Sequence, residues 1–343
     1  VYPTAAASRF PDAARRLADE IDRLLAESGH PEYAGIGIGA PGPLDPVTGI
    51  IDNPHTLPSL SGKSLTAVLA TRFRVPVRLD NDGNAALLGE LRGGAAKGAS
   101  SAVMLTFGTG VGGAAWANGG LLRGAGGSHP EIGHILVDPA GPPCYCGQRG
   151  CLESLTSGTA LSAAAKAAGF PEPEAVLLAA TVGNPTAREI VTRMQDACVT
   201  ALGTLVHAYH PEVVIFGGGV MEKHFDAFFA EKLSATAKRA TLTLAHPVRV
   251  RRALLGNRAG MIGAAALLGA DLAGKIALRA GDDYEAMSRQ AAELVVETLR
   301  RTPEARIVFA TGESPKRMYQ LLAAHPAKPA GLYQHLRAVQ LDE

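Results

Sequence analysis

The sequence predicts an α/β fold, because apolar runs typical of strands alternate with segments of helical periodicity. Helical spacing over residues 13–25 precedes a strand-like run at 33–38, and a helix expected over 64–73 leads to a strand at 75–79. Polar side chains follow directly at residues 80–84 (DNDGN). Open α/β sheets keep their chemistry where a strand ends and a helix begins.

The middle of the chain continues this alternation. Strands expected at 101–107 and 111–117 form a β-hairpin with a glycine-rich tip, and helices follow through about residue 210. A strand at 213–216 opens into three glycines, and the last α/β passage ends in a helix after Asn257.

A second unit is expected after Gly274. Its elements are a strand at 276–278, a helix over about 283–300, a strand at 306–310 and a further helix. No third strand–helix pair follows, so we expect an incomplete α/β unit.

Composition limits the classes of partner. The 343 residues, 47% of them hydrophobic, are enough for about two domains with packed cores. The net charge is +1, and no basic run interleaves with aromatic residues, so we expect neither nucleic acid nor a membrane as partner. No apolar run reaches the length of a membrane span, and the free-thiol pattern favours a cytoplasmic protein.

Three of the four cysteines lie close to one histidine. His134, Cys144, Cys146 and Cys151 offer the nitrogen and sulfur donors that suit tetrahedral Zn²⁺. A disulfide framework is a weaker alternative, because three clustered cysteines cannot all pair and Cys198 lies in an apolar helical stretch. A zinc-dependent nucleobase deaminase is weaker still, because only one residue separates the first two thiols.

Two glycine-rich segments are ambiguous by themselves. Residues 108–113 (GTGVGG) could hold phosphate with backbone N–H groups or form a plain tight turn. Residues 217–219 (GGG) could support a nucleotide or allow a close helix–strand contact.

Carboxylates supply the candidate acid–base chemistry. Asp82, beside Asn81 at a strand end, could accept a hydroxyl proton during attack on phosphorus, or could cap a helix. Glu131 and Glu153 flank the cysteine cluster and could hold sugar-like hydroxyls or lie on a solvated surface.

Six motifs in this order resemble the ROK family of sugar kinases and sugar-responsive repressors. They are residues 39–43 (GAPGP), 79–84 (LDNDGN), 105–113 (LTFGTGVGG), 130–134 (PEIGH), 144–153 (CYCGQRGCLE) and 255–264 (LGNRAGMIGA). The resemblance extends to about residue 272. It implies an actin-like (ribonuclease H-like) two-lobed ATPase fold, with the remainder of the small lobe at 1–100 and the large lobe at 101–273.

The resemblance also implies residue roles. Asp82 would be the base that takes the proton of the sugar 6-hydroxyl, and the sugar would be held by Gly42, Asn81, Asp82, Glu131, His134 and Glu153. ATP with Mg²⁺ would bind near Thr109, Gly110, Gly112, Gly217, Gly218 and Gly219. Structural zinc would bind His134, Cys144, Cys146 and Cys151, with the second ring nitrogen of His134 facing a sugar hydroxyl. We expect a homodimer or homotetramer.

The tail resembles the start of glucosamine-6-phosphate deaminase. Residues 283–288 (DYEAMS), 310–315 (ATGESP) and 341–343 (LDE) carry this resemblance. It implies a phosphate-binding loop at 311–314 and an acid/base position at Asp342, in a partial domain over 274–343. Deaminase activity is not expected from it.

Kinases of this family begin with a strand and a D-x-G-G-T loop that contacts phosphates. Residues 1–4 (VYPT) resemble the stretch after that loop. We therefore expect the first small-lobe strands to be missing, the chain to be a piece of a longer kinase–deaminase fusion, and phosphoryl transfer to be impaired.

The function expected is ATP-dependent phosphorylation of glucose, N-acetylglucosamine or N-acetylmannosamine at the 6-hydroxyl, and the tail favours amino sugars. The alternative is the sugar-sensing domain of a ROK repressor without catalysis.

Overall fold

A computed structural model describes residues 9–27, 33–240, 244, 246–269, 284–301, 320, 321 and 324. The chain divides into two compact units, which are treated separately. One comprises Val1–Phe10 and Gly35–Asp271, and the other Pro11–Ala34 and Leu272–Glu343.

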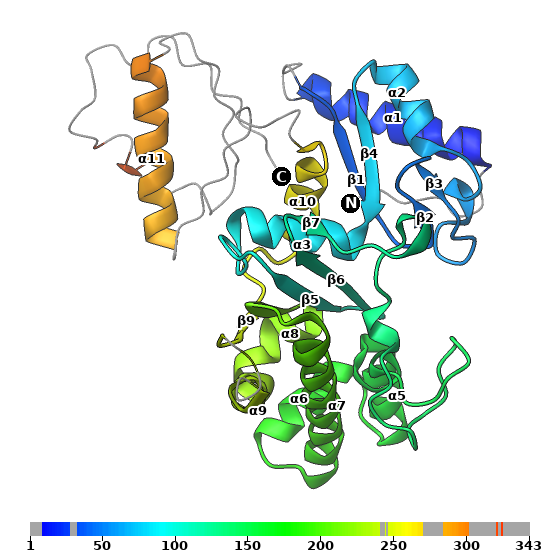
Figure 1. Ribbon diagram of the computed structural model, residues 1–343, viewed down its shortest axis with the longest axis vertical. Helices are drawn as coiled ribbons and strands as arrows, with labels where there is room; N and C mark the ends of the chain where they lie inside the picture. The colour runs from blue at the N-terminus through cyan, green and yellow to red at the C-terminus, as the bar shows by residue number, and fades with distance from the viewer. Residues whose placement is uncertain are drawn as a thin grey trace. The chain divides into compact units, whose positions relative to one another are not determined.

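The second unit contributes two described helices, α1 (Phe10–Glu27) and α11 (Tyr284–Arg301) (Figure 1). In α1, Arg23 forms ion pairs with Glu20 and Glu27 one turn away on either side. The helix expected over 283–300 is observed as α11. The expected strands at 276–278 and 306–310, the loop at 311–314 and Asp342 lie outside the described residues.

A small parallel sheet opens the first unit. Strand β1 (Ile36–Ala40) pairs with β4 (Val77–Asn81), with Ala40 opposite Asn81. The strands begin three and two residues later, respectively, than predicted, because Pro76 has no N–H to donate to the neighbouring strand. The Pro76 carbonyl oxygen accepts Ile36 N–H at 2.9 Å, and this is the first hydrogen bond between the two strands. Between them lie the hairpin of β2 (Leu44–Asp45) and β3 (Ile50–Ile51), the 3₁₀ turn Pro58–Leu60, and α2 (Leu65–Phe73).

A five-stranded sheet has the order β7-β6-β5-β8-β9. Its strands are β5 (Ala102–Phe107), β6 (Val111–Ala117), β7 (Gly120–Leu121), β8 (Val213–Gly217) and β9 (Arg249–Arg252). Strand β5 runs antiparallel to β6 and parallel to β8. Every residue of β8 is buried, as expected of a parallel strand covered on both faces.

Successive side chains of β5 belong to two different cores. Val103, Leu105 and Phe107 pack with the helices on one face, whereas Met104 packs on the other with Leu87 of the helix α3 (Asp82–Gly93). Figure 1 shows the sheet between α3 and the helices α6, α7 and α9. The helices of this region are α4 (Leu152–Thr156), α5 (Gly158–Ala167), α6 (Pro173–Thr181), α7 (Pro185–Tyr209), α8 (Gly219–His224), a π-helical turn (Phe225–Phe229) and α9 (Ala230–Ala240).

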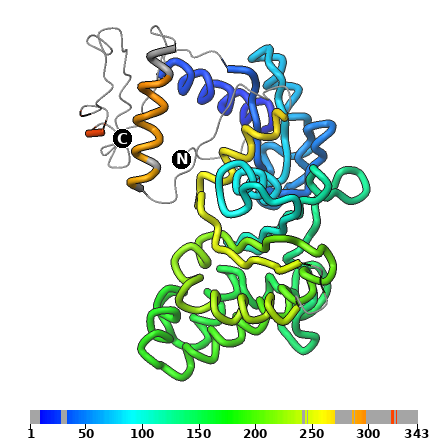
Figure 2. The backbone as a smooth tube through the Cα atoms, turned by 60° about the vertical axis from the view of Figure 1, so that its left-hand side comes forward, coloured from blue at the N-terminus to red at the C-terminus, as the bar shows by residue number. Residues whose placement is uncertain are grey.

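Helix α3 (Asp82–Gly93) joins the two sheets, because it contacts β1 and β4 of the first and β5 and β6 of the second. Helix α10 (Arg258–Ala266) packs along α3 and returns the chain from β9 to β1 (Figure 2). A Cβ atom at Gly263 would lie 1.5 Å from the carbonyl oxygen of Ala85, so glycine is required where these two helices cross. The residue at the start of α3 is therefore placed where both sheets meet.

Candidate functional site

The candidate base Asp82 lies at the corner between β4 and α3. Asn81 caps the helix: its side-chain oxygen accepts the backbone N–H of Gly83 at 2.8 Å and that of Asn84 at 3.3 Å. Asp82 follows as the first helical residue, with its side chain exposed and accepting Gly83 N–H at 2.9 Å. The capping role considered for Asp82 therefore belongs mainly to Asn81.

Asp80, which the sequence analysis did not single out, is 2% exposed beside this corner. Its carboxylate accepts the backbone N–H of Asn81 at 2.7 Å and the side-chain amide of Asn84 at 2.8 Å, and it forms an ion pair with Arg123. Arg123 also donates to the carbonyl oxygen of Gly127 at 3.2 Å. The ion pair thus ties the end of β4 to the segment after β7.

The glycine-rich hairpin tip is fixed by the start of α5. The carbonyl oxygen of Gly108 accepts Gly158 N–H at 2.8 Å, and that of Thr109 accepts the Thr159 hydroxyl at 2.8 Å. Gly108 and Thr109 themselves are exposed. These contacts hold the tip in one conformation while leaving its outer surface accessible.

Glu153 lies against the same tip. Its Oε2 accepts the backbone N–H of Val111 at 2.7 Å, and a Cβ atom at Gly110 would lie 2.6 Å from Oε2. A side chain at position 110 would therefore push the Glu153 carboxylate away from the tip. Gly112 is exposed on β6, opposite Thr106 in the strand pairing.

Strand β6 brings the other predicted sugar residues together. Ile132, in the 3₁₀ turn Ile132–His134, packs on Gly113 of β6. The carbonyl oxygen of Gly113 also lies beside Gly83 at the start of α3. The PEIGH segment, the Asp82 corner and the Glu153 contact therefore meet along one strand.

Gly42 contacts this group through a histidine. It packs against the ring of His129, whose Nε2 lies 3.2 Å from Oε1 of Glu131. This hydrogen bond holds the pKa of Glu131 below its ordinary value. Asn53 donates its side-chain amide to the Gly42 carbonyl oxygen, which fixes the turn.

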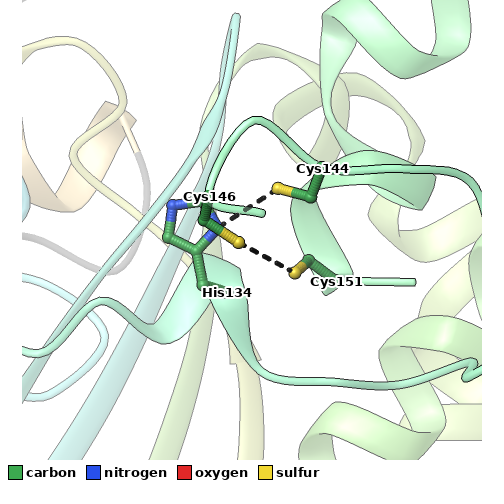
Figure 3. Close-up of side chains that lie close together, drawn as sticks. All are labelled: His134, Cys144, Cys146 and Cys151. Atoms are coloured by element: carbon green, nitrogen blue, oxygen red, sulfur yellow. Dashed lines mark hydrogen bonds between the residues drawn. The ribbon is translucent and has the colours of Figure 1, made fainter. Parts of the chain in front are cut away.

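The histidine and three cysteines converge (Figure 3). His134 Nδ1 lies 3.4 Å from Cys144 Sγ, Cys146 Sγ lies 3.6 Å from Cys151 Sγ, and all four donor atoms lie within 4.8 Å of one another. Tetrahedral zinc with Zn–S bonds of about 2.3 Å would place its sulfur ligands roughly 3.8 Å apart. The four residues therefore fit a zinc ion, and all four cysteines, including the buried Cys198, are free thiols.

The second nitrogen of His134 has a partner within the chain. Its Nε2 lies 3.0 Å from the hydroxyl of Tyr145, and the two rings meet edge to face with centroids 5.0 Å apart. The family resemblance implied a sugar hydroxyl at this position. Partial desolvation and the carboxylates of Glu153 and Glu131 raise the pKa of Tyr145 to about 12, although the residue is 81% exposed.

A cavity of about 170 Å³ adjoins the end of β8. At Gly218 φ is +88°, and a Cβ atom there would lie 2.4 Å from the carbonyl oxygen of Phe107, so this close contact requires glycine. Gly219 opens α8 and does not line the cavity. The lining residues are Ala86, Met104, Thr106, Gly217, Gly218, Glu222, Arg252, Ala253, Gly256, Asn257, Ala259 and Gly260.

Comparison with known proteins decides the family. The ROK family model matches residues 9–270. The chain belongs to the ROK family. A glucokinase from Thermotoga maritima is 39% identical over 225 residues, which are 61% of this chain and 70% of that protein. The match ends before the deaminase-like tail, which stays a prediction.

Two solved ROK structures confirm the actin-like fold. A ROK hexokinase from Thermus thermophilus is 35% identical with a TM-score of 0.69, covering 78% of this chain and 88% of that one. A ROK family glucokinase from Streptomyces griseus, in complex with glucose and AMPPNP, is 29% identical with a TM-score of 0.59, covering 74% and 88%. Of the helices in the described part of this ROK chain, none combines the length and apolarity that a membrane crossing requires.

Proposed function

We propose that this ROK chain phosphorylates glucose at the 6-hydroxyl with ATP. The observation that carries the proposal is the exposed Asp82 carboxylate at the start of α3, at the junction that β6 shares with Glu131 and Glu153. The relatives described above are named glucokinase or hexokinase, and these names support a hexose as the substrate.

In this proposal Asp82 accepts the proton of the 6-hydroxyl as its oxygen attacks the γ-phosphorus, and ADP leaves. Asn81 uses its side-chain oxygen to cap α3, so its amide nitrogen is the group offered to the sugar. Gly42, Glu131, His134 and Glu153 complete the sugar site. Because Glu131 is held ionised by His129, it can accept a sugar hydroxyl at neutral pH.

The nucleotide would extend from the hairpin tip to the cavity. Thr109, Gly110 and Gly112 would face the phosphates, and Mg²⁺ would neutralise phosphate charge when bound. The cavity beside Gly217 and Gly218 is smaller than the roughly 300–1,000 Å³ that enclose whole ligands, so it would take only one part of the nucleotide. Gly219, which begins α8 directly after Gly218, stays a predicted nucleotide contact.

The zinc ion would be structural. Four protein donors leave no open coordination position, so zinc would brace His134 and the segment leading to Glu153. The homodimer or homotetramer and the cytoplasmic location expected from the sequence stay predictions.

A coupled assay for ADP with a panel of hexoses tests the proposal. We expect turnover of glucose above that of N-acetylglucosamine and N-acetylmannosamine. Preference for an amino sugar would overturn the choice of glucose and would agree instead with the substrate class that the tail resemblance favours. Sugar binding without ADP formation for any hexose would contradict the kinase and favour the repressor-type sensing domain.

A further inference from the structure

Glu90 is a fully buried carboxylate in α3, with an exposed fraction of 0%. Its Oε2 accepts Ala95 N–H at 2.6 Å, and its Oε1 accepts Leu255 N–H at 2.9 Å. Both oxygens share Leu254 N–H, at 3.1 and 3.2 Å. The donors that reach this carboxylate within the described part of the chain are the backbone N–H groups of three residues, and these hydrogen bonds compensate its burial.

The two leucines belong to a gap between a strand and a helix. Sheet pairing ends where Ala253 N–H reaches the Phe216 carbonyl oxygen at 2.9 Å, and helical bonding begins where Arg258 N–H reaches Leu255 O at 3.1 Å. Glu90 supplies the acceptors for the N–H groups of Leu254 and Leu255 in between. A buried carboxylate thus replaces the missing strand partner.

This gap leads into the cavity. Gly256 and Asn257, the next two residues, line it together with Gly217 and Gly218. Asp82 lies at the other end of the same helix, eight positions before Glu90, a rise of about 12 Å at 1.5 Å per residue. One helix therefore carries the candidate base and fixes one wall of the cavity.

We propose that Glu90 is a positioning residue for the nucleotide. It holds the segment 254–257 at a fixed distance from Asp82, and this keeps the bound phosphoryl donor correctly placed relative to the base. This rests on the proposed kinase function. Phosphoryl transfer depends on such positioning, because the transferred group must lie in line with the attacking oxygen.

Kinetics of Glu90→Gln test the role. The glutamine amide keeps one oxygen acceptor, but its NH₂ group would face the backbone N–H of Ala95 or those of Leu254 and Leu255, which are also donors. We therefore expect KM for ATP and the dissociation constant of AMPPNP to rise about tenfold. KM for glucose should stay within about twofold. Glu90→Asp, which keeps the charge on a shorter side chain, should recover part of the loss.

Leu69→Ala is the matched control. Leu69 is also fully buried, in α2, and is not among the residues that line the cavity, so this variant should lower Tm while leaving KM for ATP unchanged. An unchanged KM for ATP and AMPPNP affinity in Glu90→Gln would overturn the role of Glu90. A wild-type chain that binds AMPPNP but transfers no phosphate would contradict only the kinase function.

Hydrogen exchange of the wild-type chain provides a second test should Glu90→Gln not fold. The amides of Leu254 and Leu255 should exchange slowly without ligand and more slowly with AMPPNP, with no further change on adding glucose alone. Fast exchange of both amides in the free chain would refute the proposal.

Discussion

The Glu153 carboxylate accepts the backbone N–H of Val111 at 2.7 Å across 42 positions of sequence. Glu153 follows the candidate zinc ligand Cys151 by two residues, and Val111 opens β6 just after the hairpin tip. The contact joins the cysteine motif directly to the loop expected to hold phosphates. A disturbance of the cysteine motif should therefore reach both the sugar and the nucleotide.

Zinc removal tests this link. We expect one zinc ion per chain by elemental analysis, and Cys146→Ser should lose most of it and weaken glucose binding at least about tenfold, in line with the loss of one metal-site residue. The buried Cys198 offers a matched control, because Cys198→Ser should retain the metal. Full zinc content in Cys146→Ser would contradict the assignment.

Asp82→Asn tests the base. The amide keeps the shape of the side chain but cannot accept the hydroxyl proton, so kcat should fall about 10²–10⁴-fold while glucose binding changes little. Asp196→Asn, which alters an exposed aspartate of α7 paired with Lys232, should keep wild-type kcat. Wild-type turnover by Asp82→Asn would rule out the base assignment.

Tyr145→Phe tests the contact to His134 Nε2. The tyrosine hydroxyl occupies the position expected for a sugar hydroxyl, so its removal frees the ring nitrogen and should tighten glucose binding by about two- to tenfold. The measurement is a calorimetric titration, with Tyr209→Phe in α7 as control. Weaker binding by Tyr145→Phe would instead show that the phenol itself binds the sugar.

Arg123→Met tests the ion pair with Asp80. Removing the cation leaves a carboxylate that is 2% exposed without its charge partner. The free energy of unfolding should fall by about 2–3 kcal/mol, which is less than the roughly 3–5 kcal/mol for a fully buried pair because Arg123 is 31% exposed. Arg193→Met, which breaks an exposed pair with Asp138, should cost under about 1 kcal/mol.

Chemical denaturation measures both changes. Adding Asp80→Asn to Arg123→Met should restore part of the lost stability, because the neutral amide is less costly to leave unpaired. Strict additivity of the two substitutions would count against a direct pair.

The cysteine motif and the glycine loops could be predicted because their information is local. His134 and the three cysteines lie within residues 134–151, and their donor types alone indicate a candidate metal site, whose donor atoms the fold brings within 4.8 Å of one another. Short apolar runs likewise predicted β5, β6 and β8, since burial on both faces of a sheet leaves a nearly continuous apolar segment in the sequence.

Long-range pairings could not be predicted in this way. Asp80 meets Arg123 across 43 positions, and Glu90 meets Leu254 across 164. Nothing in the local sequence distinguishes a carboxylate that will be buried from one that will face solvent, as the neighbours Asp80 and Asp82 show.

The sequence by itself determined the α/β class, the ROK resemblance and the set of candidate zinc donors, because periodicity and donor chemistry reside in short segments. Only the tertiary structure decided that Asn81 caps α3, that Tyr145 meets His134 and that Glu90 holds the cavity wall. These depend on which backbone and side-chain groups packing brings within hydrogen-bonding distance, and packing is set by the whole chain.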